Sequence, residues 1–167
     1  MENKIETPDN VDSESTTDSV DYNTIITESF DDLNIKSNLL RGIYGTGYEN
    51  PSAIQQKAIK PLIDGRDLIA QAQSGTGKTA TFSIGLLERI DETKNITQAV
   101  VLAHTRELAF QIEGVIKNLS TYMKIDVNLS VGGTTVRDNI DALLKNPHIV
   151  IGTPGRCLLY TSPSPRD

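Results

Sequence analysis

The sequence predicts an α/β fold in which a parallel sheet carries helices on both faces. From Asp67 to Gly152, short apolar runs alternate with segments whose apolar residues recur at helical spacing. This alternation is typical of parallel strands joined by crossover helices. Glycine-rich or polar clusters follow the expected strands, and ligands of such sheets bind at the carboxyl ends of the strands. We therefore expect a binding surface along one edge of the sheet.

Individual elements follow from the spacing of apolar residues. Phe30 opens the expected folded part, and a helix follows from Ile35 to Ile43, which Gly45 and Gly47 stop. Ser52 is a good N-cap for a short helix that runs toward Pro61. The expected strands are 67–70, which is short and buried, 98–103, which is covered on both faces, 126–131 and 148–152, and the expected later helices are 79–90, 106–123 and 134–145.

Composition limits the class of protein. The length of 167 residues fits one domain, and 37% of the residues are hydrophobic. Cys157 is the single cysteine, so the chain has no intramolecular disulfide partner, and His104 and His148 stand far apart without thiol neighbours. No apolar run approaches the length that spans a membrane. A soluble intracellular protein without a zinc site or membrane partner is the expectation.

The net charge of −6 belongs to one region of the chain. Residues 1–28 contain eight acidic side chains and one lysine, which gives −7, and the remainder sums to +1. The acidic segment is also poor in large apolar residues, so we expect a disordered tail at 1–28. The near-neutral remainder neither favours nor excludes a nucleic-acid partner.

The segment from Ala72 to Thr79 has the residues of a phosphate-binding loop. Glycines at two positions permit backbone angles that turn consecutive N–H groups inward at the start of a helix. Lys78 would reach the outer phosphates, and the Thr79 hydroxyl would ligate Mg²⁺. The general pattern G-x-x-x-x-G-K-[ST] has glycine where this chain has Ala72, which indicates either a variant subfamily or a chance match. The expected loop residues are Ser74, Gly75, Thr76, Gly77, Lys78 and Thr79, with Lys78 and Thr79 as the catalytic pair and Thr79 as the metal ligand.

Several motifs in order resemble one family. They are Gly47–Gln55, Ala72–Thr79, Thr105–Ala109, the doublet Gly132–Gly133 and Thr153–Arg156. Together they resemble the N-terminal RecA-like domain of DEAD-box ATP-dependent RNA helicases, which are P-loop NTPases. The resemblance runs from about Phe30 to Arg156, and within the family it is strongest to the eukaryotic initiation factor 4A group and its exon-junction relatives. In this family the first position of the phosphate loop is alanine, as at Ala72.

The resemblance implies an adenine site. Gly47–Gln55 is similar to the family's Q motif, and Phe30 is similar to the upstream aromatic residue that stacks on adenine. A glutamine amide offers one donor and one acceptor, which suits the N6 and N7 edge of adenine and not that of guanine. ATP and Mg²⁺ are therefore the expected cofactors, with Phe30 and Gln55 as base contacts. Without the resemblance, Phe30 would be interpreted as a core residue and Gln55 as a residue on a helix surface.

The resemblance also implies RNA as a partner. Hydroxyls, backbone N–H groups and arginines suit contacts to the sugar–phosphate backbone that ignore base identity. Helix caps and surface salt bridges are the alternative interpretation of each motif taken singly. His104 stands where the family has proline. The expected RNA residues are Thr105, Arg106, Glu107, Gly132, Gly133, Thr153, Pro154, Gly155 and Arg156.

Other family motifs are absent from the sequence. The chain contains no Asp-Glu-Ala-Asp box, no Ser-Ala-Thr motif and no second RecA-like domain. We therefore expect a C-terminally incomplete domain at 29–156 that binds ATP and RNA without turnover, from a cytoplasmic parent with initiation-factor scaffold partners. Alternatives are a nuclear, splicing-linked relative, another phosphate-loop enzyme such as a GTPase or a transporter ATPase, and a non-catalytic interaction module.

The last residues, 157–167, depart from the pattern. Pro163 and Pro165 lie too close together for the helix that should follow Arg156. We interpret 157–167 as a non-native tail, with a native Ser/Pro linker as the alternative.

Overall fold

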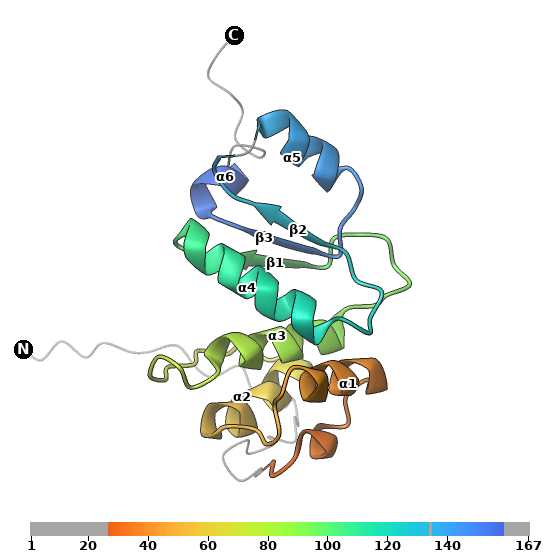
Figure 1. Cartoon of the computed structure of the whole chain (residues 1–167), viewed down its shortest axis with the longest axis vertical. Coiled ribbons are helices and arrows are strands. Elements are labelled where there is room, and N and C mark those ends of the chain that lie inside the picture. The colour runs from red at the N-terminus through yellow and green to blue at the C-terminus, as the bar shows by residue number, and fades with distance from the viewer. Residues whose placement is uncertain (1–26, 134, 159–167) are drawn as a thin grey trace, which may run out of the picture.

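The computed structural model describes residues 27–133 and 135–158 (Figure 1). The predicted tail at 1–28 lies almost wholly outside these residues, as does most of the predicted segment 157–167. Thr27, the first described residue, is already buried. The elements in chain order are η1 (Phe30–Leu33), α1 (Ser37–Gly45), α2 (Ala53–Ile63), α3 (Lys78–Arg89), β1 (Ala99–Leu102), α4 (Arg106–Leu119), β2 (Val127–Ser130), α5 (Val136–Leu143), β3 (Ile149–Gly152) and α6 (Pro154–Leu158).

A parallel sheet of three strands, in the order β1-β3-β2, organises the upper part of the molecule (Figure 1). All four residues of the central strand β3 are buried, as expected for a strand with neighbours on both sides and helices on both faces. Helix α4 covers one face, and α5 and α6 lie on the other (Figure 1). The predicted fold class is therefore confirmed.

Helices α1, α2 and α3 form a layer beyond α4 (Figure 1). Two glycines permit close helix crossings: a Cβ on Gly42 of α1 would lie 1.9 Å from the carbonyl oxygen of Leu119, and one on Gly85 of α3 would lie 2.6 Å from Cβ of Leu62. Lys36, just before α1, donates from Nζ to three carbonyls at the C-terminal end of α3, those of Leu87, Glu88 and the C-cap Ile90. These contacts fix the position of α3, the helix that begins at the phosphate loop.

One predicted strand is wrong. Residues 67–70 form no strand, and the side chain of Ile69 is fully exposed. A strand exists only by pairing with a neighbour, and none of the strands in the described part of the chain pairs with this segment. The segment therefore has the composition of a strand, but none of the described strands lies beside it to pair with it.

The remaining differences concern exposure and element ends. β1 is an edge strand whose residues Val100 and Leu102 are 61% and 58% exposed, so the prediction that it is covered on both faces is wrong. Pro61 lies inside α2, which continues to Ile63 although proline removes one hydrogen bond within the helix. Helix α4 ends at Leu119, earlier than the predicted 123, where Ser120 forms its C-cap. Among the described residues, none of the helices has both the length and the apolar character needed to cross a membrane.

Candidate nucleotide-binding site and nucleic-acid interface

The predicted phosphate loop leads directly into helix α3. Gly75 and Gly77 have φ angles of +81° and +92°, a region that other residues avoid. Gly77 is the N-cap of α3, and no side chain caps the helix there. The N–H groups of the first turn of α3 therefore remain available to an anion, as the sequence predicts.

The side chain of Lys78 folds back across this loop. Its Nζ donates to the carbonyl oxygen of Ala72 and, at 2.7 Å, to that of Gln73. Phosphate oxygens could replace these two carbonyls as acceptors, because an ammonium group forms stronger hydrogen bonds with charged oxygens. The residues present thus fit a phosphate group, with Lys78 moving from carbonyl to phosphate.

Thr79 supplies a half-buried hydroxyl in the first turn of α3. In the part of the chain that the structure describes, no group of three His, Cys, Asp or Glu side chains lies close enough to hold a metal ion. A Mg²⁺ ion bound here would therefore depend on Thr79, phosphate oxygens and water, which is a coordination that magnesium accepts.

The start of α2 is attached to the phosphate loop through Ser52 and Gln55. The Ser52 N–H donates to Gln55 Oε1 at 2.7 Å, and the Ser52 hydroxyl donates to the Thr76 carbonyl oxygen at 2.9 Å. Gln55 is 2% exposed, and a Cβ on Gly77 would lie 2.8 Å from its Nε2. The amide is therefore held beneath the loop, and its carbonyl oxygen retains a second lone pair for another donor.

Sequence reasoning identifies Ser52 as an N-cap and misses its bond to the loop. The S-x-x-Q spacing from Ser52 to Gln55 is that of a capping box, which the structure contains. That signal predicts the contact within α2. It carries no information about Thr76, which lies 24 residues later.

Phe30 lies in an aromatic cluster. Its ring is edge-on to Tyr44 and Tyr48, with centroids 6.3 and 6.4 Å away, and its side chain has no exposed surface. The Tyr44 hydroxyl donates to Asp31, which lowers the pKa of Asp31 and raises that of Tyr44. Stacking of a base on Phe30 stays a prediction, and in this structure it requires a neighbouring group to move.

The predicted nucleic-acid residues of three strand ends meet at one edge of the sheet. The register pairs Gly152 with Leu102 on one side and with Ser130 on the other. Consequently Thr105–Glu107, Gly132–Gly133 and Thr153–Arg156, which follow these strands, are brought together. The sequence predicts four polar clusters, each directly after a strand. The phosphate loop follows no strand of this sheet, so three of the four clusters lie at strand ends.

The residues of this group differ in how much of their surface is exposed. Thr105, Arg106, Glu107, Gly133, Pro154 and Gly155 are exposed, Gly132 and Thr153 are half-buried, and Arg156 is buried. Thr105 also caps α4 by accepting the Leu108 N–H at 3.2 Å, which confirms that helix capping is part of its role.

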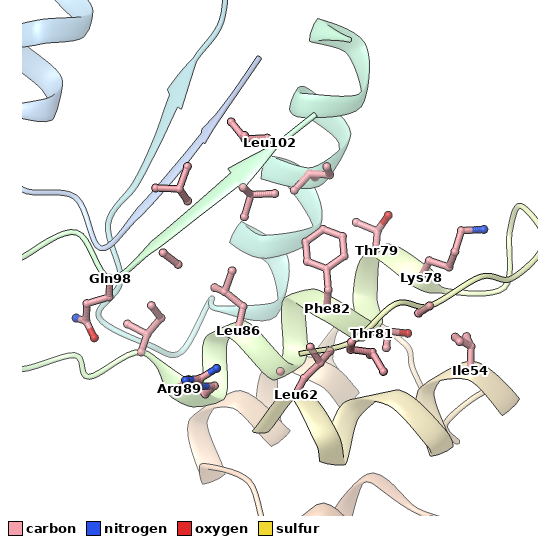
Figure 2. Close-up of a pocket in the computed structure, with 18 of the residues that line it drawn as sticks. Ile54, Leu62, Lys78, Thr79, Thr81, Phe82, Leu86, Arg89, Gln98 and Leu102 are labelled. Carbon is pink, nitrogen blue, oxygen red and sulfur yellow. The ribbon is translucent and has the colours of Figure 1, made fainter. Parts of the chain in front are cut away.

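A cavity of about 900 Å³ lies between α3 and the open side of β1 (Figure 2). Phe82 and Leu86 point from α3 toward β1 (Figure 2), and Lys78 is among the residues that line the cavity. The walls are mostly apolar, and Thr79 lies at one end of them. This cavity is therefore distinct from the phosphate loop in chemistry although it adjoins it.

Comparison with known proteins identifies the family. The family model for DEAD/DEAH box helicases matches residues 52–165. The chain belongs to the DEAD/DEAH-box helicase family. It is 57% identical over 143 residues to ATP-dependent RNA helicase eIF4A of Meyerozyma guilliermondii, with 82% of this chain and 36% of the relative aligned. It is 59% identical over 129 residues to the protein of the same name from Candida albicans, covering 77% and 32%.

Solved DEAD-box structures agree with the fold. A DEAD box protein from Methanococcus jannaschii superimposes with a TM-score of 0.76 at 38% identity, covering 81% of this chain and 37% of that one. Saccharomyces cerevisiae Dbp5 bound to RNA and ADP BeF3 gives a TM-score of 0.73 at 36% identity, covering 81% and 34%. This DEAD-box chain thus spans about a third of the length of the relatives that it matches. The family match begins at Ser52, so Phe30 lies outside it, while the phosphate loop and the strand-end residues lie inside.

Proposed function

We propose that this chain is the ATP-binding part of an RNA helicase that acts in translation initiation in the cytoplasm, in contact with initiation-factor scaffold proteins. The observation that supports the proposal is the connection between Gln55 and the loop: Ser52 is hydrogen-bonded to both Gln55 and Thr76, and the Gln55 amide lies next to Gly77. The names of the two relatives described above support the choice of pathway. A splicing-linked relative in the nucleus is the alternative within the family.

We propose a division of labour within the nucleotide site. The N–H groups at the start of α3 bind phosphate oxygens, and Lys78 neutralises their charge. Thr79 holds Mg²⁺, which when bound neutralises further charge on the phosphates. Gln55 selects adenine, and Ser52 keeps the amide oriented through the hydrogen bond at Oε1. RNA binds by its backbone along the exposed strand-end residues.

The test of the nucleotide site is the affinity for labelled ATP and GTP in the presence of Mg²⁺. Lys78→Ala should weaken both nucleotides alike, by about tenfold or more, because it removes a charged hydrogen bond to phosphate. Gln55→Ala should reduce the preference for ATP over GTP by about 1–3 kcal/mol. Lys117→Ala removes the same charge from an exposed site on α4 and should leave both affinities unchanged. Equal binding of ATP and GTP by the unmodified chain would refute the assignment of Gln55.

We further propose that this chain binds without catalytic turnover. These 167 residues contain no Asp-Glu-Ala-Asp box, whose carboxylates would hold the metal and align the attacking water. Without these carboxylates, RNA-stimulated ATP hydrolysis by this chain should be undetectable. Hydrolysis that requires RNA and disappears in Lys78→Ala would contradict this proposal and favour an active enzyme over a non-catalytic binding module.

A further inference from the structure

Two of the residues that follow the strands of the sheet are arginines, and their environments differ. Arg106, in the first turn of α4, is exposed, whereas Arg156, in α6, is only 9% exposed. A phosphate group of a bound strand can reach the guanidinium of Arg106 without rearrangement of the protein. It cannot reach that of Arg156 in the same way.

Arg156 is bonded to the start of α5. Its Nη2 donates to the carbonyl oxygen of Thr135 at 2.9 Å. Thr135 is the N-cap of α5, where its hydroxyl accepts the Asp138 N–H at 3.1 Å, and its carbonyl also accepts the Asn139 side-chain amide at 3.3 Å. The guanidinium therefore joins α6, which follows β3, to the residue at which α5 begins.

Arg106 packs against the glycine doublet that leads to Thr135. A Cβ added to Gly133 would lie 2.8 Å from Arg106 Nη2 and 3.2 Å from its Cζ. Gly133 has a φ of +102°, so this close approach depends on a backbone that only glycine adopts readily. The position of the exposed guanidinium thus depends on the position of Gly133.

We propose that Arg156 is a positioning residue for RNA binding. It holds Thr135 close to the end of β3, and Gly133, two positions earlier in the chain, in turn places Arg106 where it meets the phosphate backbone. The planar fork of donors on arginine suits this role, because a buried guanidinium bonded to a backbone carbonyl fixes both partners. The inference rests on the proposed RNA function and assigns the direct phosphate contact to Arg106.

The test is a double-mutant cycle in binding to fluorescently labelled single-stranded RNA, measured between about 50 and 200 mM salt. Arg106→Gln should weaken binding about tenfold at low salt and reduce the slope of log K against log salt by about 0.7, the value for one contact to a single strand. Arg156→Gln should have a similar effect, because it displaces Arg106. The double variant should then be no weaker than either single variant.

Other outcomes of the cycle overturn the inference. Additive losses, with the slope reduced by about 1.4 in the double variant, would mean that Arg156 contacts a separate phosphate. Unchanged RNA binding in Arg156→Gln would mean that the residue serves stability alone. Affinity for ATP serves as the control, since the phosphate loop is separate from these residues and should be unaffected.

A second variant covers the case in which Arg156→Gln does not fold. Gly133→Ala adds a Cβ that would lie 2.8 Å from Arg106 Nη2 and so should also displace Arg106. The loss of RNA affinity in this variant should likewise fail to add to the loss in Arg106→Gln. Additive losses here would overturn the inference independently. If the unmodified chain binds no RNA even at the lowest salt concentration, the proposed function fails and the inference fails with it. Binding with additive losses refutes the inference alone.

Discussion

The contact between Gly77 and Gln55 makes a sharp prediction about the phosphate loop. Gly77→Ala adds a Cβ 2.8 Å from Gln55 Nε2, which is closer than such atoms approach in proteins. Gly75→Ala is the matched control, because it has a similar φ and nothing lies within 4 Å of the added atom. The difference between the two variants therefore isolates the contact with Gln55 from the strain of the backbone.

The magnitudes follow from the two contributions. Left-handed backbone angles cost about 1–2 kcal/mol in alanine, and this cost applies to both variants. Gly77→Ala must also displace the buried amide, which breaks its hydrogen bond with Ser52 N–H and adds about 1–3 kcal/mol. We expect the free energy of unfolding to fall by about 1–2 kcal/mol in Gly75→Ala and by about 2–5 kcal/mol in Gly77→Ala.

Urea unfolding followed by circular dichroism measures both free energies. In a Gln55→Ala background the obstructing amide is gone, so Gly77→Ala should then cost no more than Gly75→Ala. Equal destabilisation of the two variants in the unmodified background would refute the reasoning. So would an excess cost of Gly77→Ala that persists after Gln55 is removed, because the strain would then arise elsewhere.

Three further predictions concern the rest of the molecule. Gly42→Ala should lower the free energy of unfolding by about 3 kcal/mol, because the new Cβ would lie 1.9 Å from a carbonyl oxygen of α4; a neutral effect in urea unfolding would contradict so close a crossing of α1 and α4. Ile151→Ala, in the centre of the sheet, should cost about 2–5 kcal/mol, whereas Val100→Ala, which is 61% exposed, should cost about 0.5 kcal/mol or less in the same assay. Hydrogen bonds from the side chain and backbone of Thr93 lower the pKa of Asp91 from 3.8 to about 2. The stabilisation from Asp91 should therefore be present above pH 3.8 and be lost as the pH falls toward 2, and acid titration of Asp91→Asn should lack this component.

Elements with strong local signals could be predicted from the sequence. The apolar run before Gly152 predicts β3, and the residues around Thr105 predict the start of α4. These signals are local, because strand composition and helix caps depend on a few neighbouring residues. The glycines at 75 and 77 are likewise predicted to be positions of unusual backbone geometry, which the positive φ angles confirm.

The pairing of strands could not be predicted from the same information. Residues 67–70 and 98–103 have similar apolar composition, yet only the second contains a strand, because only it lies beside β3. The exposure of Val100 and Leu102 has the same origin, since burial of an edge strand depends on what lies next to it. Composition reports that a segment suits a sheet and does not report which neighbours are present.

The candidate site shows the same limit at the level of side chains. Sequence motifs place Ser52, Gln55 and Arg156 in a functional region, but they treat each residue separately. In the structure Ser52 is bonded to the phosphate loop and Arg156 to the start of α5, and both partners lie about 20 or more residues away in the chain. A buried hydrogen bond to a backbone carbonyl leaves no trace in sequence, because every residue has that carbonyl. Motif matching therefore assigns a direct contact with the ligand even to a residue that acts by holding a loop. Double-mutant cycles, such as that of Arg106 and Arg156, separate the two roles.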